Sequence, residues 1–195
     1  MSEQSGMLWQ VARRVSDWVD PKNVIVVVSL GFGVHYGWAG LGWAALAIVF
    51  AAVVPMAYIV YGKSGGRWSE RHLTNRIKRM SVLPVISASA AAGIALEAVT
   101  SAPCPMIALT AAMWATITAI WPVTRWYKIS VHAAVTAGSV VMLAQAYGWW
   151  WLLGLVVVPV LGWARVRVQE HTVGQVVSGA LLGLVVAGGV FALVR

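Results

Sequence analysis

Three short polar stretches interrupt an otherwise apolar chain, and each brings basic residues together with histidine. The candidate residues are Arg71, Lys78 and Arg79 in the first stretch, Lys128, Ser130 and His132 in the second, and Arg165 and His171 in the third. Guanidinium and ammonium groups neutralise the oxygens of a phosphoryl group, and imidazole titrates near neutral pH, so it serves as nucleophile or acid. If these stretches converge, they predict a pocket for a multiply charged anion.

The spacing of His171 and Gln175 predicts a contact that orients the imidazole ring. On a helix these two residues lie one turn apart on the same face. The amide oxygen of Gln175 can then accept a hydrogen bond from the ring and fix its tautomer, although it supplies no negative charge. Glu170 is adjacent in sequence, but we expect its side chain to point about 100° away around the same helix.

The residue types argue against metal and nucleic-acid chemistry. No set of His, Cys, Asp and Glu has the spacing of metal ligands, and Cys104 is the single cysteine, so the sequence implies neither a metal nor another cofactor. The net charge of +8 raises the question of nucleic acid, but the basic residues lie in short stretches between apolar runs. That distribution favours a membrane surface or an anionic lipid headgroup, and we expect no nucleic acid.

The elements that position these residues are expected to be membrane-spanning helices. Hydrophobic residues make up 60% of the 195-residue chain and charged residues 10%, against about 25% charged in a typical globular protein. Lipid suits such a composition, because helices satisfy their own backbone hydrogen bonds there. Twelve Trp residues, several at the ends of apolar runs, fit an aromatic belt. The predicted fold class is all-α, a polytopic transmembrane helical bundle in a cell membrane that we expect to be prokaryotic.

Apolar runs predict seven spans. They cover residues 24–38, 42–62, 82–100, 105–121, 130–147, 149–164 and 171–194. Because a span needs about 20 residues and several of these runs are shorter, six spans with one re-entrant segment is an alternative.

The distribution of charge predicts the orientation in the membrane. Thirteen of the 14 Lys and Arg residues precede the first span or lie in the stretches 63–80, 122–129 and 165–170, which share one side; only Arg195 lies opposite. The positive-inside rule therefore places the amino terminus and the three polar stretches in the cytoplasm.

One membrane-embedded domain over residues 1–195 accounts for the whole chain. Within it, residues 1–22 carry apolar side chains at helical spacing among Arg13, Arg14 and Asp17, which indicates a short interfacial helix. Residues 63–190 form the core that contains the polar stretches.

The spacing of the second and third stretches resembles two motifs of the type 2 phosphatidic acid phosphatase superfamily, P-S-G-H and S-R-x5-H-x3-D. Ala164, Arg165, His171 and Gln175 reproduce the spacing of S-R-x5-H-x3-D, with Ala for Ser and Gln for Asp. The segment Ile129-Ser130-Val131-His132 matches P-S-G-H, retaining Ser and His and replacing Pro and Gly.

The first stretch resembles the remaining motif of that superfamily, K-x6-R-P. Arg71 and Lys78 have the required separation and Arg79 follows, whereas Met80 replaces the proline. His72 with Arg79 is an alternative frame. The resemblance covers residues 63–190, and the two helices expected over 82–121 are a departure from the family pattern.

The resemblance implies a metal-independent phosphatase that works through a phosphohistidine. His171 would be the nucleophile, His132 the general acid that protonates the leaving oxygen, and Gln175 the residue that orients His171. The residues expected to hold the phosphate oxygens are Arg71, Lys78, Arg79, Lys128, Ser130 and Arg165.

Two functions follow as hypotheses. The first is a membrane lipid phosphatase that hydrolyses a phosphomonoester or diphosphate of a long-chain lipid. A polyprenyl (di)phosphate is preferred, because small helices rich in Gly and Ala leave room for a single long chain; phosphatidate and phosphatidylglycerol phosphate are alternatives. The second is a catalytically weakened relative that binds or scaffolds anionic lipid, which the replacements at positions 80, 129, 131 and 175 motivate.

Overall fold

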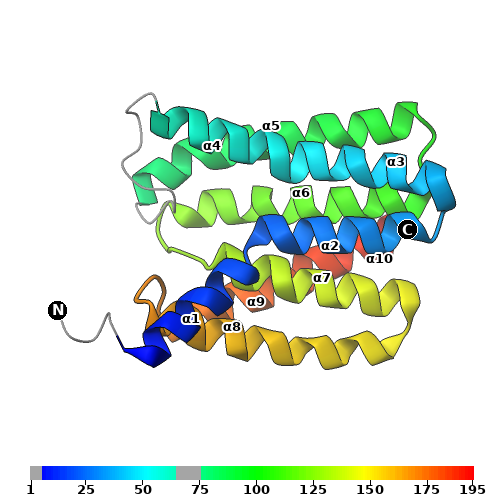
Figure 1. Ribbon diagram of the computed structural model, residues 1–195. Helices are drawn as coiled ribbons and strands as arrows, with labels where there is room; N and C mark the ends of the chain where they lie inside the picture. Colours follow the sequence, from blue (N-terminus) through cyan, green and yellow to red (C-terminus); the bar gives the residue numbers. More distant parts are fainter. Residues whose placement is uncertain (1–5, 65–75) are drawn as a thin grey trace.

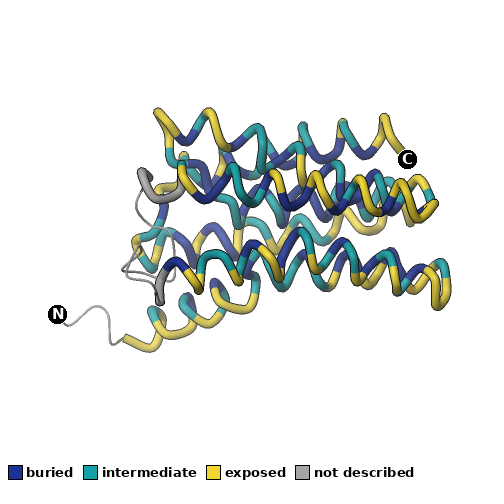
Figure 2. The backbone as a smooth tube through the Cα atoms, turned by 90° about the horizontal axis from the view of Figure 1, so that it is seen from above, coloured by how far each residue is buried: buried dark blue, intermediate teal, exposed yellow. Residues whose placement is uncertain are grey.

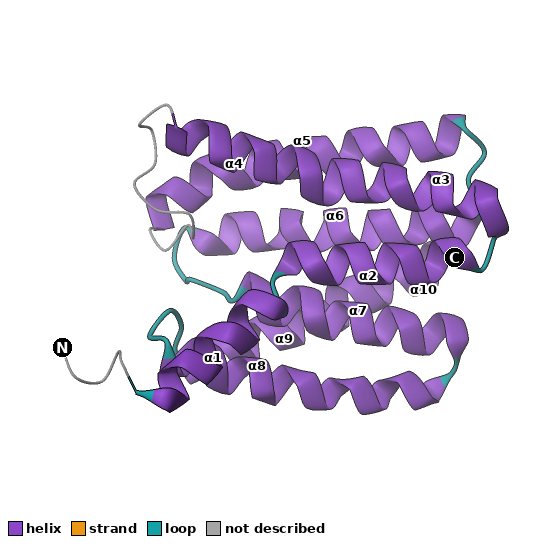
Figure 3. Cartoon of the chain, viewed as in Figure 1, coloured by secondary structure: helices purple, strands orange, loops and turns teal. Residues whose placement is uncertain are grey.

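Figure 1 shows a bundle of helices, in a computed structural model that describes the backbone of residues 6–64 and 76–195 and the side chains of 6–62 and 80–195. Every regular element in these ranges is a helix (Figure 3), so the all-α class is confirmed. The elements are α1 (Met7–Trp18), α2 (Pro21–Val34), α3 (Gly37–Ile48), the π-helical turn η2 (Val49–Val53), α4 (Val54–Ser64), α5 (Arg76–Val99), α6 (Cys104–Thr124), α7 (Val131–Tyr147), the 3-10 helix η3 (Trp149–Val156), α8 (Val157–Arg167), α9 (Val173–Leu182), the π-helical turn η4 (Gly183–Ala187) and α10 (Gly188–Val194).

Polar side chains cap the amino-terminal ends of three helices, α2, α7 and α9. Asp20 accepts a hydrogen bond from the backbone N of Lys22 at 3.1 Å, and Pro21 occupies the first position of α2. Ser130 caps α7 in the same way, and Thr172 caps α9. These caps fix where each helix starts, and therefore which side chains project from its first turn.

The predicted helical runs agree with the structure to within a few residues, with one consequential difference. The first break falls at His35 and Tyr36, just before Gly37, whose φ of 65° favours glycine. The last helix was predicted from residue 171, but α9 begins at Val173 because Thr172 caps it. His171 therefore precedes the helix.

Among the described residues, five helical segments are long and apolar enough to cross a membrane. They are Gly37–Gly62, Met80–Val99, Cys104–Thr124, Trp149–Arg167 and Val173–Val194, while Pro21–Val34 and Val131–Tyr147 are shorter apolar helices. Figure 2 shows the exposed positions along the outer faces and the buried positions between the helices. Large apolar side chains lie on these outer faces, including Trp38, Leu153 and Leu193. The arrangement is compatible with an integral membrane protein.

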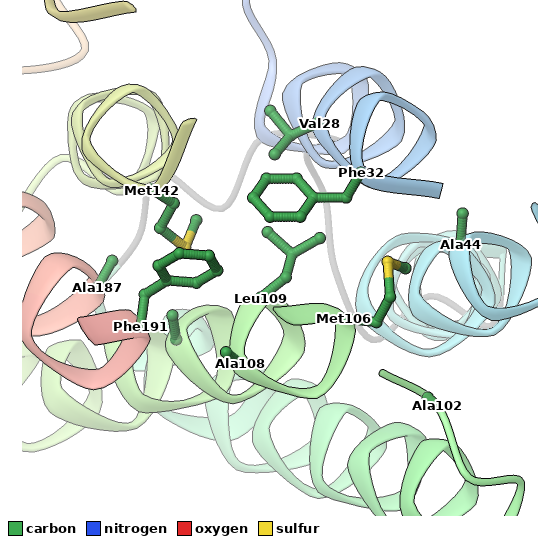
Figure 4. Close-up of a cluster of buried hydrophobic side chains, with 11 residues drawn as sticks. Val28, Phe32, Ala44, Ala102, Met106, Ala108, Leu109, Met142, Ala187 and Phe191 are labelled. Atoms are coloured by element: carbon green, nitrogen blue, oxygen red, sulfur yellow. The ribbon is translucent and has the colours of Figure 1, made fainter. Parts of the chain in front are cut away.

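A buried apolar cluster joins α2, α3, α6, α7 and α10 (Figure 4). Phe32 of α2 meets Phe191 of α10 edge-to-face, with ring centroids 5.5 Å apart. Leu109 of α6 and Met142 of α7 belong to the same cluster. This packing fixes α2 relative to α7, and their first turns both contribute to the site.

Helices α7 and α9 approach closely through glycine. A Cβ atom at Gly179 would collide with the carbonyl oxygen of Ser130, and one at Gly183 would collide with that of Ala134. The backbones are therefore in direct contact at these two positions. This contact sets the start of α7 beside the segment that leads into α9.

Replacing Gly183 by Ala tests this contact. Because the new methyl group would meet backbone rather than a side chain that can move aside, Gly183→Ala should lower the free energy of unfolding by about 1–3 kcal/mol. The measurement is thermal unfolding of the detergent-purified protein. Gly189→Ala is the control, since nothing lies within 4 Å of a Cβ there. Equal stability of both variants would contradict the proposed close contact.

Candidate active site

One cavity collects residues from several of the polar stretches. It has a volume of about 200 Å³ and is lined by α2, η2, α4, α5, α6 and α7, with the end of α8, the turn that follows it and Ala187 of η4. Its charged and imidazole-bearing residues are Asp20, Lys22, Lys128, His132, Arg165, Glu170 and His171. The rest of the lining is mostly apolar and includes Ile25, Met56, Ile59, Ile86, Met113 and Ile117. Four residues predicted from the second and third stretches, Lys128, His132, Arg165 and His171, thus share one cavity.

The ring of His171 is oriented by Gln175. Its Nδ1 lies 3.0 Å from Gln175 Oε1, and since an amide oxygen only accepts, Nδ1 donates. The same oxygen accepts from the backbone N of Thr172 at 3.3 Å, as part of the capping box of α9. The predicted contact is confirmed, although by a different route: the capping box turns Gln175 back toward a residue that precedes the helix. In its neutral form this tautomer carries the lone pair on Nε2.

His132 and Ser130 occupy the first turn of α7 but have different surroundings. Ser130 is fully buried, and its hydroxyl accepts from the backbone N of Ala133 at 3.4 Å. Its backbone N donates to the carbonyl of Gln175 at 3.1 Å, and Ser130 is not among the residues that line the cavity. His132 does line it, with Nε2 3.5 Å from Arg165 Nη1.

Arg165 is buried at the end of α8, with 3% of its surface exposed. It forms an ion pair with Glu170 and donates from Nη1 to Ser16 Oγ at 2.7 Å. Arg13 Nη1 donates to Glu170 Oε1 at 3.0 Å. The buried Nε of Arg165, by contrast, has no hydrogen-bond partner among the described residues. Arg165 nevertheless lines the cavity, and a positive charge in the cavity wall suits an anion.

The site contains carboxylates that the sequence analysis did not expect. Glu170 was predicted to point away from His171 around the last helix, which is wrong because that helix begins only at Val173 and the chain before it turns through Gln169, whose φ is 58°. That turn brings Glu170 back against Arg165. Glu170 also fixes Lys128, whose Nζ donates to its carbonyl oxygen at 2.8 Å. The carboxylates offset part of the positive charge in the cavity.

The segment before α2 contributes residues that sequence reasoning assigned only to a membrane anchor. Asp20 and Lys22 line the cavity, and Ser16 contacts Arg165. The signal that could have located Asp20 was the Asp-Pro pair, which typically begins a helix and so places the carboxylate at its start. The contact between Ser16 and Arg165 leaves no comparable signal, because it joins residues 149 positions apart.

The first stretch is described only in part. Arg71 and His72 lie outside the described residues. Lys78 and Arg79 lie in the first turn of α5, and their side chains are outside the described set. The role predicted for all of them in phosphate binding therefore stays a prediction.

The described residues form no group of three or more His, Cys, Asp or Glu side chains that could hold a metal ion. Comparison of the chain with models of protein families, with curated proteins and with solved structures finds no match. A function is therefore inferred from the geometry of the cavity.

Removal of Glu170 tests the importance of the buried ion pair. Since Glu170→Ala leaves the buried guanidinium of Arg165 without its ion-pair partner, we expect the free energy of unfolding to fall by about 3 kcal/mol or more. The measurement is thermal unfolding in detergent. Asp17→Ala is the control, because its ion pair with Arg13 is exposed and contributes at most about 1 kcal/mol. A larger loss in the control would show that the pair is not a main support of the site.

Proposed function

We propose that the protein is a membrane lipid phosphatase, similar to the type 2 phosphatidic acid phosphatases, that cleaves a phosphomonoester or diphosphate of a long-chain lipid. The observation that carries the proposal is the shared cavity. His132 comes from the second polar stretch and Arg165 and His171 from the third, and all three line one cavity whose remaining wall is mostly apolar. A phosphate group among the cations and a hydrocarbon chain among the helices fit such a lining.

His171 is the proposed nucleophile. With Nδ1 donating to Gln175, Nε2 attacks phosphorus, and the bond from phosphorus to the leaving oxygen breaks. The leaving oxygen takes a proton from His132. Water then attacks the phosphohistidine and gives a proton back to His132, which releases inorganic phosphate and restores both histidines.

Phosphate binding is assigned first to Arg165 and Lys128. Arg165 and Lys128 each bring a positive charge to the cavity. The resemblance adds Arg71, Lys78 and Arg79 from the first stretch. Ser130 is assigned a backbone role at the start of α7, because its hydroxyl is used in the cap.

The substrate is proposed to carry a single long chain. Apolar side chains from several helices, Ile25, Ile59, Ile86 and Ile117 among them, line the cavity that holds the histidines. A polyprenyl phosphate or diphosphate is the preferred substrate, and phosphatidate and phosphatidylglycerol phosphate are the alternatives to compare with it.

In the membrane we propose seven spans, with six spans and one re-entrant segment as the alternative. The two short apolar helices, α2 and α7, are the elements on which this difference depends. The site lies at the cytoplasmic end, where the basic residues gather, and α1 lies in the interface. Its polar face carries Gln10, Arg14 and Asp17, all exposed.

A second candidate is a protein that binds anionic lipid without turnover. It is favoured by Gln175, because an amide stabilises the imidazolium formed during attack less than a carboxylate does. Measurement of turnover separates the two candidates.

Phosphate release by the purified protein is the first test. The wild type, assayed with a chelator present, should release phosphate from at least one of phosphatidate, a polyprenyl phosphate and a polyprenyl diphosphate. His171→Ala should lower the rate at least about 1,000-fold, because it removes the nucleophile.

His35→Ala is the matched control and should leave the rate unchanged. His35 is exposed at the end of α2 and packs against Tyr36, away from the cavity lining. Equal release by the wild type and His171→Ala would eliminate the phosphohistidine mechanism. Binding of these lipids without any release would favour the second candidate.

The orientation can be tested with the chain's own cysteine. Cys104 is exposed at the start of α6, at the end of the bundle opposite to α1 and the site (Figure 1). In intact cells, an impermeant maleimide should label the wild type. The double variant Cys104→Ser/Gln10→Cys should be labelled only after permeabilisation. Cys104→Ser alone gives the background, and the reverse pattern of labelling would place the site outside.

A further inference from the structure

Asp20 has two carboxylate oxygens with different neighbours. Oδ1 accepts from the backbone N of Lys22 at 3.1 Å and lies 3.4 Å from Lys22 Nζ. Oδ2 lies 3.9 Å from Nε2 of His132. Asp20 is buried, with 8% of its surface exposed, and lines the cavity. One oxygen therefore caps the amino-terminal end of α2. The other faces the imidazole of His132, which the proposed reaction needs as an acid.

The charges around His132 oppose one another. Arg165 Nη1 can only donate to the same Nε2, at a long 3.5 Å, so both this contact and its charge disfavour a second proton on the ring. Asp20 favours that charge from 3.9 Å. The other charged or titratable residues that line the cavity are Lys22, Lys128, Glu170 and His171. Because Arg165 is itself paired with Glu170, part of its effect on His132 is already offset.

We infer that Asp20 is the counter-charge that keeps His132 protonated beside Arg165, so that His132 can donate a proton to the leaving oxygen. The inference rests on the proposed function and adds to it a residue from outside the three polar stretches. As the bond from phosphorus to the leaving oxygen breaks, the proton on His132 passes to that oxygen and His132 becomes neutral. Asp20 acts through His132 and is a positioning residue.

The distance between Asp20 and His132 suits an electrostatic interaction rather than a hydrogen bond. At 3.9 Å the two atoms are beyond hydrogen-bond range, so the carboxylate stabilises the imidazolium without binding its proton in a directed bond. The proton thus stays available to a leaving oxygen in the cavity. In this chain Gln175 gives His171 a neutral partner, so Asp20 is the carboxylate that faces a histidine of the site.

The capping role of Asp20 can be separated from its charge. Asn and Asp begin helices about equally well, because either side chain accepts from the backbone of the first turn. Asp20→Asn therefore keeps the start of α2 and removes only the negative charge. Asp17→Asn removes the same charge from an exposed position on α1, so it is the matched control.

The test compares two leaving groups. An alkoxide leaves poorly and needs a proton, whereas nitrophenolate leaves readily without one. Asp20→Asn should lower kcat/KM at least about tenfold with the lipid phosphate that the wild type hydrolyses, and less than about threefold with p-nitrophenyl phosphate. Asp17→Asn should match the wild type with both substrates.

A double variant tests whether Asp20 acts through His132. His132→Ala should show the same dependence on the leaving group, and adding Asp20→Asn to it should cause no further loss. Equal losses with both substrates, or independent losses in the double variant, would overturn the inference while leaving the phosphatase proposal intact. A wild type with no activity on any phosphate ester would instead refute the proposed function itself.

Discussion

A guanidinium group buried within an apolar bundle is the constraint on which the polar end of this protein depends. Arg165 has almost no access to water, so its charge must be met by protein groups. Glu170 supplies the opposite charge and Ser16 an acceptor, which draws α1 and the turn after α8 onto the same residue. Glu170 also accepts a hydrogen bond from Arg13 at its carboxylate and one from Lys128 at its carbonyl oxygen. The segments that carry candidate chemistry are thus tied together through one ion pair.

Contacts between small residues fix the positions of the helix backbones more tightly than the ion pair does. Long charged side chains tolerate shifts of the backbone, whereas the contacts at Gly179 and Gly183 do not, because backbone meets backbone there. Those contacts fix α7 against α9, and a hydrogen bond from Ser130 to the carbonyl of Gln175 joins their first turns. The ring of His171 is oriented from the same turn of α9. The backbone contacts at Gly179 and Gly183 and the hydrogen bonds of Ser130 and His171 therefore position the same two segments.

The sequence predicts the helices well because hydrophobic runs, Pro and Gly are local signals, and it predicts the contact of His171 with Gln175 because the spacing is short. It fails where a backbone turn decides the outcome. The last helix was expected from residue 171 and begins at Val173, so Glu170, expected to point away around that helix, lies on a turn and meets Arg165. Asp20 was missed because its partner His132 is distant in the chain. In addition, residues 1–22, which include Asp20, were interpreted only as an interfacial segment.

The contact between Ser16 and Arg165 has a consequence for biosynthesis. The two residues are 149 positions apart, and the chain is made from its amino terminus. Ser16 and Asp20 therefore emerge from the ribosome long before the arginine and imidazole groups that complete their surroundings. Until α8 has been synthesised, the hydrogen bond between Ser16 and Arg165 cannot form, so α1 lacks this contact with the rest of the polar end. A nascent chain that stalls before α8 would carry Ser16 and Asp20 without Arg165, Glu170 and His171, and therefore without the complete cavity.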